Sequence, residues 1–295
     1  MAVLVDPPRW PAHGTTFGHL VSDQSLDELH AFARAVDLPP RAFDHDHYDV
    51  PARRYPDLLA AGAQPVASTE LLRRLVAAGL RVRPLDRTPK PAAALAAVRA
   101  AWDDVLPGAD GLRDDLLGRW TEPHRRYHDV RHLAQCLDAL RRLAGGDAVA
   151  RPVALAAWFH DAVYEGRAGA DERASADLAE RLLPRWVGRR EASEVARLVL
   201  VTVQHAPEPG DPDAAVLVDA DLSVLGQVAG RYHVYLRDVR EEYARYTDEE
   251  FRQGRLAVVE SLLGRDRLFH TRPGRRLWAD RATVNLAEEH ARLSG

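Results

Sequence analysis

The sequence predicts two domains, a small α/β domain at the N-terminus followed by an all-α helical domain. In residues 1–83, short β-like segments alternate with helical ones, which is the pattern of an α/β unit. Residues 84–91, PLDRTPKP, are rich in proline and charge and are typical of a linker. Residues 92–295 contain hardly any β-like segments and repeat apolar residues at helical spacing. A chain of 295 residues is long enough for two such cores.

The first domain opens with AVLVD, an expected strand, and a glycine-bearing loop. SLDELHAFARAV is expected to be a helix, which Ser25 and Glu28 open as a capping box. Further expected elements alternate as strand, helix, strand, helix and strand: RAFD (41–44), VPARRYPDLLAAGA (50–63), PVAS (65–68), TELLRRLVAAG (69–79) and LRVR (80–83). This alternation is why we expect helices packed on a small sheet.

The second domain is expected to be a helical bundle without an internal repeat. Its apolar positions recur at helical spacing in 92–106, 131–144, 174–183, 191–205, 232–246, 251–264 and 281–293. A further apolar run, PVALAAWFHDAV, is also expected to be helical and places His160 and Asp161 side by side.

Composition is that of an ordinary globular protein, with 46% hydrophobic residues and a net charge of −4. This charge does not favour nucleic acid or an anionic membrane as a partner. We find no apolar stretch long enough to span a bilayer and no secretory signal pattern. Cys136 is the one cysteine, so no internal disulfide can form, which fits a reducing cytoplasm.

The histidines of the second domain form a pattern that indicates a metal site. His124, His128 and His132 follow one another at four-residue intervals, so on a helix they would share one face. His160 and Asp161 lie in a second expected helix. Imidazoles and carboxylates from several facing helices are how helical bundles build metal sites.

Two more elements complete the pattern. His205 ends another expected helix, and VLVDADLSVLG supplies Asp219 and Asp221. Each element alone has a simpler interpretation: His205 would favour a helix C-terminus electrostatically, and Asp219 suits an N-cap. The adjacent His160 and Asp161 are the hardest to explain in this way, because two polar groups are placed in an apolar helix. A shared cation would satisfy both.

At these residues the chain resembles the HD-domain superfamily of metal-dependent phosphohydrolases. The matching segments are RYHDVRH, WFHDAVY, DERASADLA, LVTVQH, VDADLSVLG, VREEY and ATVNLAEEH, which span roughly residues 95–293. The resemblance implies an all-α fold and a metal centre with four ligands: His132, His160, Asp161 and Asp221. Relatives with two metals use extra histidines before the last aspartate. This chain has only His205 there, so we expect a single ion.

The resemblance also implies roles around the metal. His128 would lie behind a ligand or face the substrate, and Glu172 and His205 occupy positions where relatives orient water or bind phosphate. Arg126, Arg131 and Arg240 are candidate phosphate contacts, although each would serve equally as an exposed ion-pair partner. Imidazole and carboxylate ligands suit Mn²⁺, Fe²⁺, Co²⁺ or Ni²⁺ better than Mg²⁺.

The implied reaction is hydrolysis of a phosphoester, with nucleotides as the commonest substrates in the superfamily. The alternative is an HD module that senses a nucleotide or a metal without turnover. The N-terminal segment is similar to an uncharacterised bacterial domain, through VLVDPPRW, SDQSLDELHAFA and HYDVPARRY. That resemblance implies no activity. At its expected strand ends lie Asp6, His45, His47 and Tyr48, which we interpret as an ordinary polar loop, with a second site as the alternative.

Overall fold

The computed structural model describes residues 2–295 and divides them into two compact units. The first contains the described residues up to Thr88 together with Val228–Arg237, and the second contains Pro89–Gln227 and Asp238–Gly295. A small sheet region followed by a mostly helical region confirms the predicted fold class. A compact unit is not the same as an independently folding domain, so the predicted extents 1–83, 84–91 and 92–295 stay predictions.

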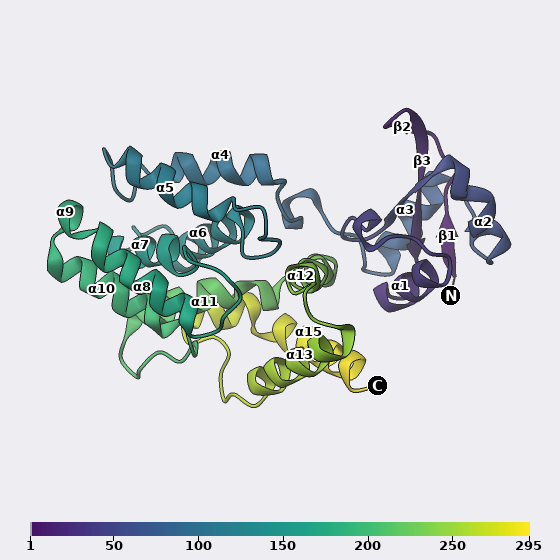
Figure 1. Cartoon of the computed structure of the whole chain (residues 1–295). Coiled ribbons are helices and arrows are strands. Elements are labelled where there is room, and N and C mark those ends of the chain that lie inside the picture. The colour runs from purple at the N-terminus through teal and green to yellow at the C-terminus, as the bar shows by residue number, and fades with distance from the viewer. Residues whose placement is uncertain (1) are drawn as a thin grey trace. The chain divides into compact units, whose positions relative to one another are not determined.

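The first unit is built around a five-stranded mixed sheet (Figure 1). Its strands are β1 (Val3–Val5), β2 (Trp10–Ala12), β3 (Thr15–Ser22), β4 (Tyr48–Pro51) and β5 (Gln64–Pro65). The long strand β3 pairs antiparallel with β1, β2 and β4, and β1 pairs parallel with β5. The central position of β3 brings residues from distant parts of the unit to its two edges.

Helices cover both faces of this sheet because its side chains alternate between two apolar clusters. Val5 and Leu20 face one cluster, which includes residues of α1 (Leu26–Ala35) and α2 (Tyr55–Ala60). Leu4 and Val21 face the other, which contains Leu71 and Leu75 of α3 (Ser68–Ala77). Ser25 caps α1 by accepting a hydrogen bond from the Glu28 amide, whereas the Glu28 carboxylate accepts from Ser22 instead of closing the capping box.

Several expected strands are wrong. RAFD is not a strand, because the prolines before it favour a 3-10 turn at Pro40–Ala42, leaving only a bridge between Phe43 and Tyr48. LRVR also forms no strand, since the Val82 amide donates to the Asp46 carboxylate, 2.7 Å away. Conversely, β2 and β3 lie where a loop was expected, and β4 was not predicted.

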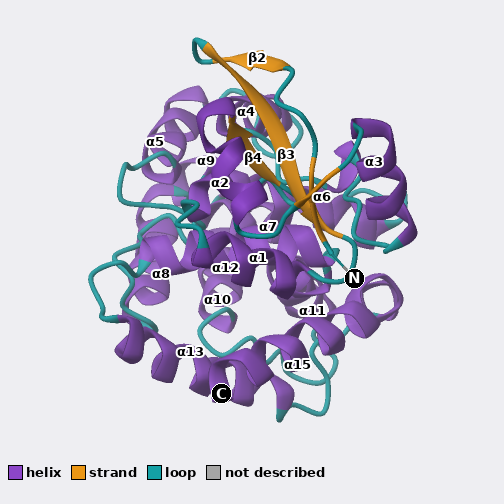
Figure 2. Ribbon diagram, turned by 90° about the vertical axis from the view of Figure 1, so that its right-hand side faces the viewer, coloured by secondary structure: helices purple, strands orange, loops and turns teal. Residues whose placement is uncertain are grey.

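The second unit is helical, as predicted (Figure 2). Its helices are α4 (Pro91–Ala101), α5 (Asp110–Trp120), α6 (Val130–Ala144), α7 (Arg151–Phe159), α8 (Ala170–Leu182), α9 (Pro184–Val187), α10 (Arg189–Val201), α11 (Pro212–Asp221), α13 (Asp248–Leu263), α14 (Arg272–Gly274) and α15 (Asp280–Ser294); α12 (Ala229–Glu242) has its last turn here. Across residues 2–295, no helix has the length and apolar character needed to cross a membrane.

The centre of this unit is formed by α6, α7 and α11. The side chains of α7 from Val153 to Phe159 are all buried, so this helix is enclosed on every side. α6 is amphipathic, and it packs against α7 and α11 through its buried face. Asp129 caps the start of α6, and Gly145 ends it in the left-handed conformation that glycine adopts without strain. These three helices hold the candidate site.

Candidate metal centre

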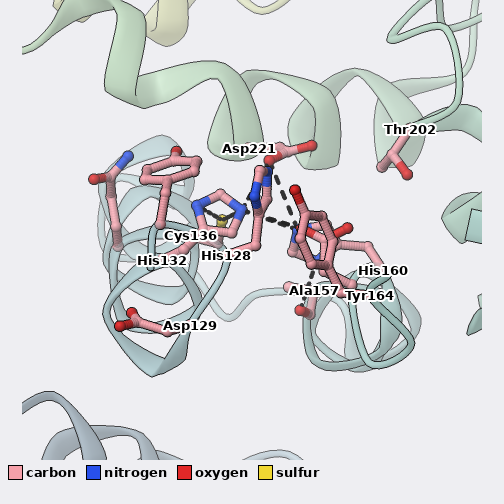
Figure 3. Close-up of polar contacts among 12 residues, drawn as sticks. His128, Asp129, His132, Cys136, Ala157, His160, Tyr164, Thr202 and Asp221 are labelled. Atoms are coloured by element: carbon pink, nitrogen blue, oxygen red, sulfur yellow. Dashed lines mark hydrogen bonds and ion pairs between the residues drawn. The ribbon is translucent and has the colours of Figure 1, made fainter. Parts of the chain in front are cut away.

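Three helix ends bring His132, His160 and Asp221 together in the interior of the helical unit (Figure 3). His132 lies in the first turn of α6, His160 directly follows α7, and Asp221 is the last residue of α11. Only 2% of His132 and 1% of His160 are exposed. Buried imidazoles require polar partners, and each of these two has one or more within the cluster.

The two imidazoles face each other between two carboxylates. His132 Nε2 lies 3.1 Å from His160 Nε2 and 3.1 Å from an oxygen of Asp221. An oxygen of Asp161 lies 3.2 Å from His160 Nε2 and 3.7 Å from His132 Nε2. His160 Nδ1 donates to the Ala157 carbonyl at 2.9 Å, which directs Nε2 toward the cluster. The structure thus brings together all four residues that the HD resemblance implies as metal ligands.

Cys136 joins this cluster one helical turn after His132. One potential ligand atom each from His132, Cys136, His160 and Asp221 lies within 4.8 Å of the other three. This buried set of nitrogen, sulfur and oxygen donors could hold a metal ion. Burial raises the pKa of the Cys136 thiol well above its usual value. The sequence prediction missed Cys136, although its i, i+4 spacing from His132 was the available signal.

The charges in the cluster favour a cation. Burial disfavours the charged form of His160, but Asp161 and Asp221 outweigh it and raise the pKa of His160 to about 9. For His132, burial dominates and lowers the pKa. Burial alone would raise the pKa of Asp161 and Asp221, yet the neighbouring histidines hold both well below the usual range. Both carboxylates therefore stay ionised, and positive charge is drawn to the space between them.

His124, His128 and His132 do not share one helical face, so that prediction is wrong. The helix α6 begins only at Val130, because Asp129 accepts a hydrogen bond from the Arg131 amide and caps the helix there. His124 instead lies in the preceding turn and donates to the Tyr164 carbonyl at 2.8 Å.

His128 lies beside the cluster and is held by Glu242 of α12. His128 Nδ1 is 2.5 Å from a carboxylate oxygen of Glu242, and the His128 ring stacks on Tyr164 at 4.3 Å between centroids. Tyr164 also donates its hydroxyl to Glu242 at 2.8 Å. The centroids of the His128 and His132 rings are 5.6 Å apart. His128 is therefore next to the candidate ligands and has a fixed orientation.

Glu242 is a buried carboxylate that the sequence prediction did not identify. Its second oxygen accepts hydrogen bonds from the amides of Arg126, Tyr127 and His128. Burial alone would raise the pKa of Glu242, but His128 and these donors lower it to about 2. For His128, burial lowers the pKa and Glu242 more than offsets it, so the pKa is raised. The half-buried His128 and the buried Glu242 carboxylate form an ion pair. VREEY contains two glutamates, and the sequence did not indicate which one turns inward.

His205 contacts the cluster through Asp221. His205 Nε2 lies 2.9 Å from the Asp221 oxygen that does not face His132. The residue follows α10 in a left-handed conformation (φ 49°), and its carbonyl accepts from Arg265. Glu172, on α8, has a buried carboxylate oxygen without a hydrogen-bond partner among the described residues. None of the described contacts joins Glu172 to the cluster, so its predicted role stays a prediction.

The three arginines predicted to bind phosphate all have partners within the protein. Arg126 donates to the carbonyls of Pro123 and Arg125, Arg131 pairs with Asp129 and Asp238, and Arg240 pairs with Asp248. Their contact with a substrate stays a prediction.

A different arginine, Arg125, was missed. It is 3% exposed and donates to the carbonyls of His128 and Asp161, at 2.9 and 2.8 Å. Arg125 therefore links the turn that carries His128 to the segment that carries Asp161.

Asp219 is not an N-cap, because α11 extends through both aspartates and is capped by Asp211. Two residues apart on this helix, Asp219 and Asp221 point to different sides. Asp219 accepts hydrogen bonds from the amides of His270 and Thr271, at 2.7 and 2.9 Å. Asp219 therefore fixes the chain entering α14, and only Asp221 belongs to the cluster.

Comparison with known proteins identifies one part of the chain. A family described as "protein of unknown function (DUF4031)" matches residues 3–78, within the sheet unit. This agrees with the predicted resemblance of the N-terminal segment to an uncharacterised domain. No curated protein and no solved structure matches the chain.

Proposed function

We propose that the helical unit is a metal-dependent phosphohydrolase of the HD type, acting on a phosphoester, with nucleotides as the first class to test. One observation carries this proposal: the buried Nε2 atoms of His132 and His160 face each other at 3.1 Å between two carboxylates. A proton on one Nε2 atom can be donated to only one or two of the other three groups, whereas a cation can bind all four at once. The chain order His132, His160-Asp161, Asp221 is the order that the HD resemblance implies.

The donor set fits a transition-metal ion. His132, His160, Asp161 and Asp221 supply imidazole and carboxylate donors, which suit Mn²⁺, Fe²⁺, Co²⁺ or Ni²⁺ better than Mg²⁺. When bound, such an ion lowers the pKa of a coordinated water and offsets negative charge on a phosphoryl group. His205 would orient Asp221 by its hydrogen bond at 2.9 Å.

His128 is the residue best placed to act on the substrate. Glu242 holds its Nδ1, so Nε2 is the nitrogen left to meet a substrate oxygen. Glu242 raises the pKa of His128 and so favours the protonated ring, which would donate a hydrogen bond to phosphate or a proton to the leaving group. Tyr164 stacks on the ring and fixes its plane.

A sensing module remains the second candidate, and one observation favours it. The guanidinium groups of Arg126, Arg131 and Arg240 are all engaged within the protein. Phosphate binding by any of them would require these contacts to break. A module that senses the metal itself, without turnover, needs no such arginine.

Metal reconstitution of the full chain distinguishes the phosphohydrolase from the sensing module. Metal-free protein is reloaded with Mn²⁺, Fe²⁺, Co²⁺, Ni²⁺ or Mg²⁺ and screened against phosphomonoesters and nucleotides. We expect phosphate release that depends on a transition metal and is abolished in His160→Gln. The control His290→Gln, a partly exposed histidine of α15, should retain full activity. Stoichiometric metal and nucleotide binding without release across the screen would instead favour the sensing module.

A further inference from the structure

The sheet unit contains a second group of potential ligands: His19, His47 and Asp49. His19 of β3 lies directly opposite Asp49 of β4 in the antiparallel register, and His47 immediately precedes β4. One potential ligand atom from each lies within 4.8 Å of the other two. The rings of His19 and His47 are 5.0 Å apart and nearly perpendicular, at 82°. Strand pairing therefore brings together two imidazoles and one carboxylate.

Each of these histidines has its own buried carboxylate behind it. His19 Nδ1 lies 3.3 Å from an oxygen of Asp6, and His47 Nδ1 lies 2.6 Å from an oxygen of Asp46. Asp6 and Asp46 are both completely buried, with 0% exposure. With Nδ1 facing a carboxylate, Nε2 is the nitrogen left for a ligand, and His47 Nε2 lies 3.5 Å from Asp49. A carboxylate behind Nδ1 is how proteins orient metal-binding histidines.

The backbone is shaped to bury these two carboxylates. At Gly18 a Cβ atom would lie 2.5 Å from the Asp6 carbonyl oxygen and 3.2 Å from its carboxylate, so only glycine lets β3 pass so close to Asp6. Asp6 also accepts from the His19 amide at 2.6 Å. Asp46 accepts from the Val82 amide at 2.7 Å and pairs with Arg81. Burying two carboxylates costs free energy, and here each of the two orients one histidine.

The group opens onto a cavity of about 560 Å³ within the sheet unit. His19, His47 and Asp49 line it together with Trp10, Ser68 and Thr69, and leucines of α3 form an apolar part of the wall. The Asp49 side chain is 49% exposed, so a small molecule or water can reach the group.

We propose that His19, His47 and Asp49 form a second metal site, which takes one Zn²⁺ or similar divalent transition cation. Two imidazoles and one carboxylate are a ligand set of zinc sites that keep a further position open. Here that position would face the cavity. This site stands independently of the proposed phosphohydrolase, because it shares no residue with the helical cluster. Its alternative is a set of ion pairs in which a protonated His47 lies between Asp46 and Asp49.

The test is a titration of metal-free, full-length protein with Co²⁺, followed by visible absorption and metal analysis. We expect two ions per chain. His47→Gln should remove one ion, and Asp49→Asn should weaken that ion's binding by at least the roughly tenfold that is typical for loss of a group that merely supports a ligand, because Asp49 would be a ligand itself. Asp49 is half exposed, so its variant should fold even where His47→Gln does not. His13→Asn is the matched control, since His13 is exposed in the same unit.

The variants also separate this proposal from the proposed function. If the wild-type chain binds one ion, and His160→Gln keeps this ion while His47→Gln loses it, the result supports the sheet site and shows that the helical cluster binds no metal. One ion that disappears only in His160→Gln overturns the sheet site. Wild-type stoichiometry and affinity in folded Asp49→Asn and His47→Gln would overturn it as well, and would leave the ion-pair alternative.

Discussion

The two histidine clusters are built on opposite principles. In the helical cluster His132 and His160 face each other at 3.1 Å and share two carboxylates between them. In the sheet cluster His19 and His47 each have a separate carboxylate behind the ring, and both residues line a cavity. The first arrangement concentrates negative charge around one buried point. The second orients its ligands in advance and leaves them accessible. From this comparison we expect that removing one side chain weakens metal binding more in the helical cluster, because each of its groups contacts several others.

We expect the largest effect on metal binding and turnover from Asp221→Ala, with Asp219→Ala as its comparison. Asp221 joins His132 and His205, so its loss should release the metal and reduce turnover by several orders of magnitude. Asp219→Ala should keep the metal and lower the free energy of unfolding by about 1–3 kcal/mol, because the amides of His270 and Thr271 lose their acceptor. Metal analysis and urea unfolding of both variants check this. A metal-free Asp219 variant beside a metal-loaded Asp221 variant would reverse the assignment.

The next effect concerns His128 and His132, which the structure separates into a flanking residue and a cluster member. We expect His128→Gln to lower turnover about 100-fold while the metal is retained, since a positioned proton donor typically contributes that much. His132→Ala should lose the metal. Bound metal and the steady-state rate are measured for each. Loss of the ion in the His128 variant alone would show that His128 is itself a ligand.

The pH dependence of stability tests the buried partner of His128. The pKa of Glu242 in the folded protein is about 2, below its usual value of 4.5. Its carboxylate therefore stabilises the fold above about pH 4.5, and this stabilisation is lost as pH falls toward 2. We expect Glu242→Gln to cost about 2–3 kcal/mol at pH 7 and progressively less in acid. Urea unfolding between pH 7 and pH 3 measures the difference. The exposed Glu288→Gln should follow the wild type, and a pH-independent gap would contradict this account.

We expect the smallest effect on stability and metal binding from Gly18→Ala in the sheet unit. The new Cβ would press on Asp6, and the required backbone shift should cost about 1–2 kcal/mol in unfolding free energy. It should weaken the sheet site and leave the helical cluster unchanged. Gly111→Ala is the control, because nothing lies within 4 Å of that position in α5. Thermal unfolding and Co²⁺ titration compare the two variants, and equal behaviour would show that Gly18 does not position Asp6.

The helical unit was largely predictable from the sequence because helices depend on local contacts. Apolar residues at helical spacing indicated α6, α10, α13 and α15, since each helix makes its hydrogen bonds within itself. The resemblance to HD hydrolases implied His132, His160, Asp161 and Asp221 as candidate ligands, and the structure places these four side chains together. The predicted helix ends were wrong in two places. Asp129 caps the start of α6, so His128 lies before the helix, and α11 continues through Asp219.

Only the tertiary structure decided the partners that lie far apart in the chain. The strands β3 and β4 were not predicted, because a strand takes its hydrogen bonds from another segment. The meeting of His19 with His47 follows from that pairing and from nothing in either segment alone. Glu242 likewise reaches His128 across 114 residues. The sequence by itself determined which residue types are present and which helices carry them, whereas packing decided which carboxylate faces which histidine, because that choice depends on contacts that no local pattern records.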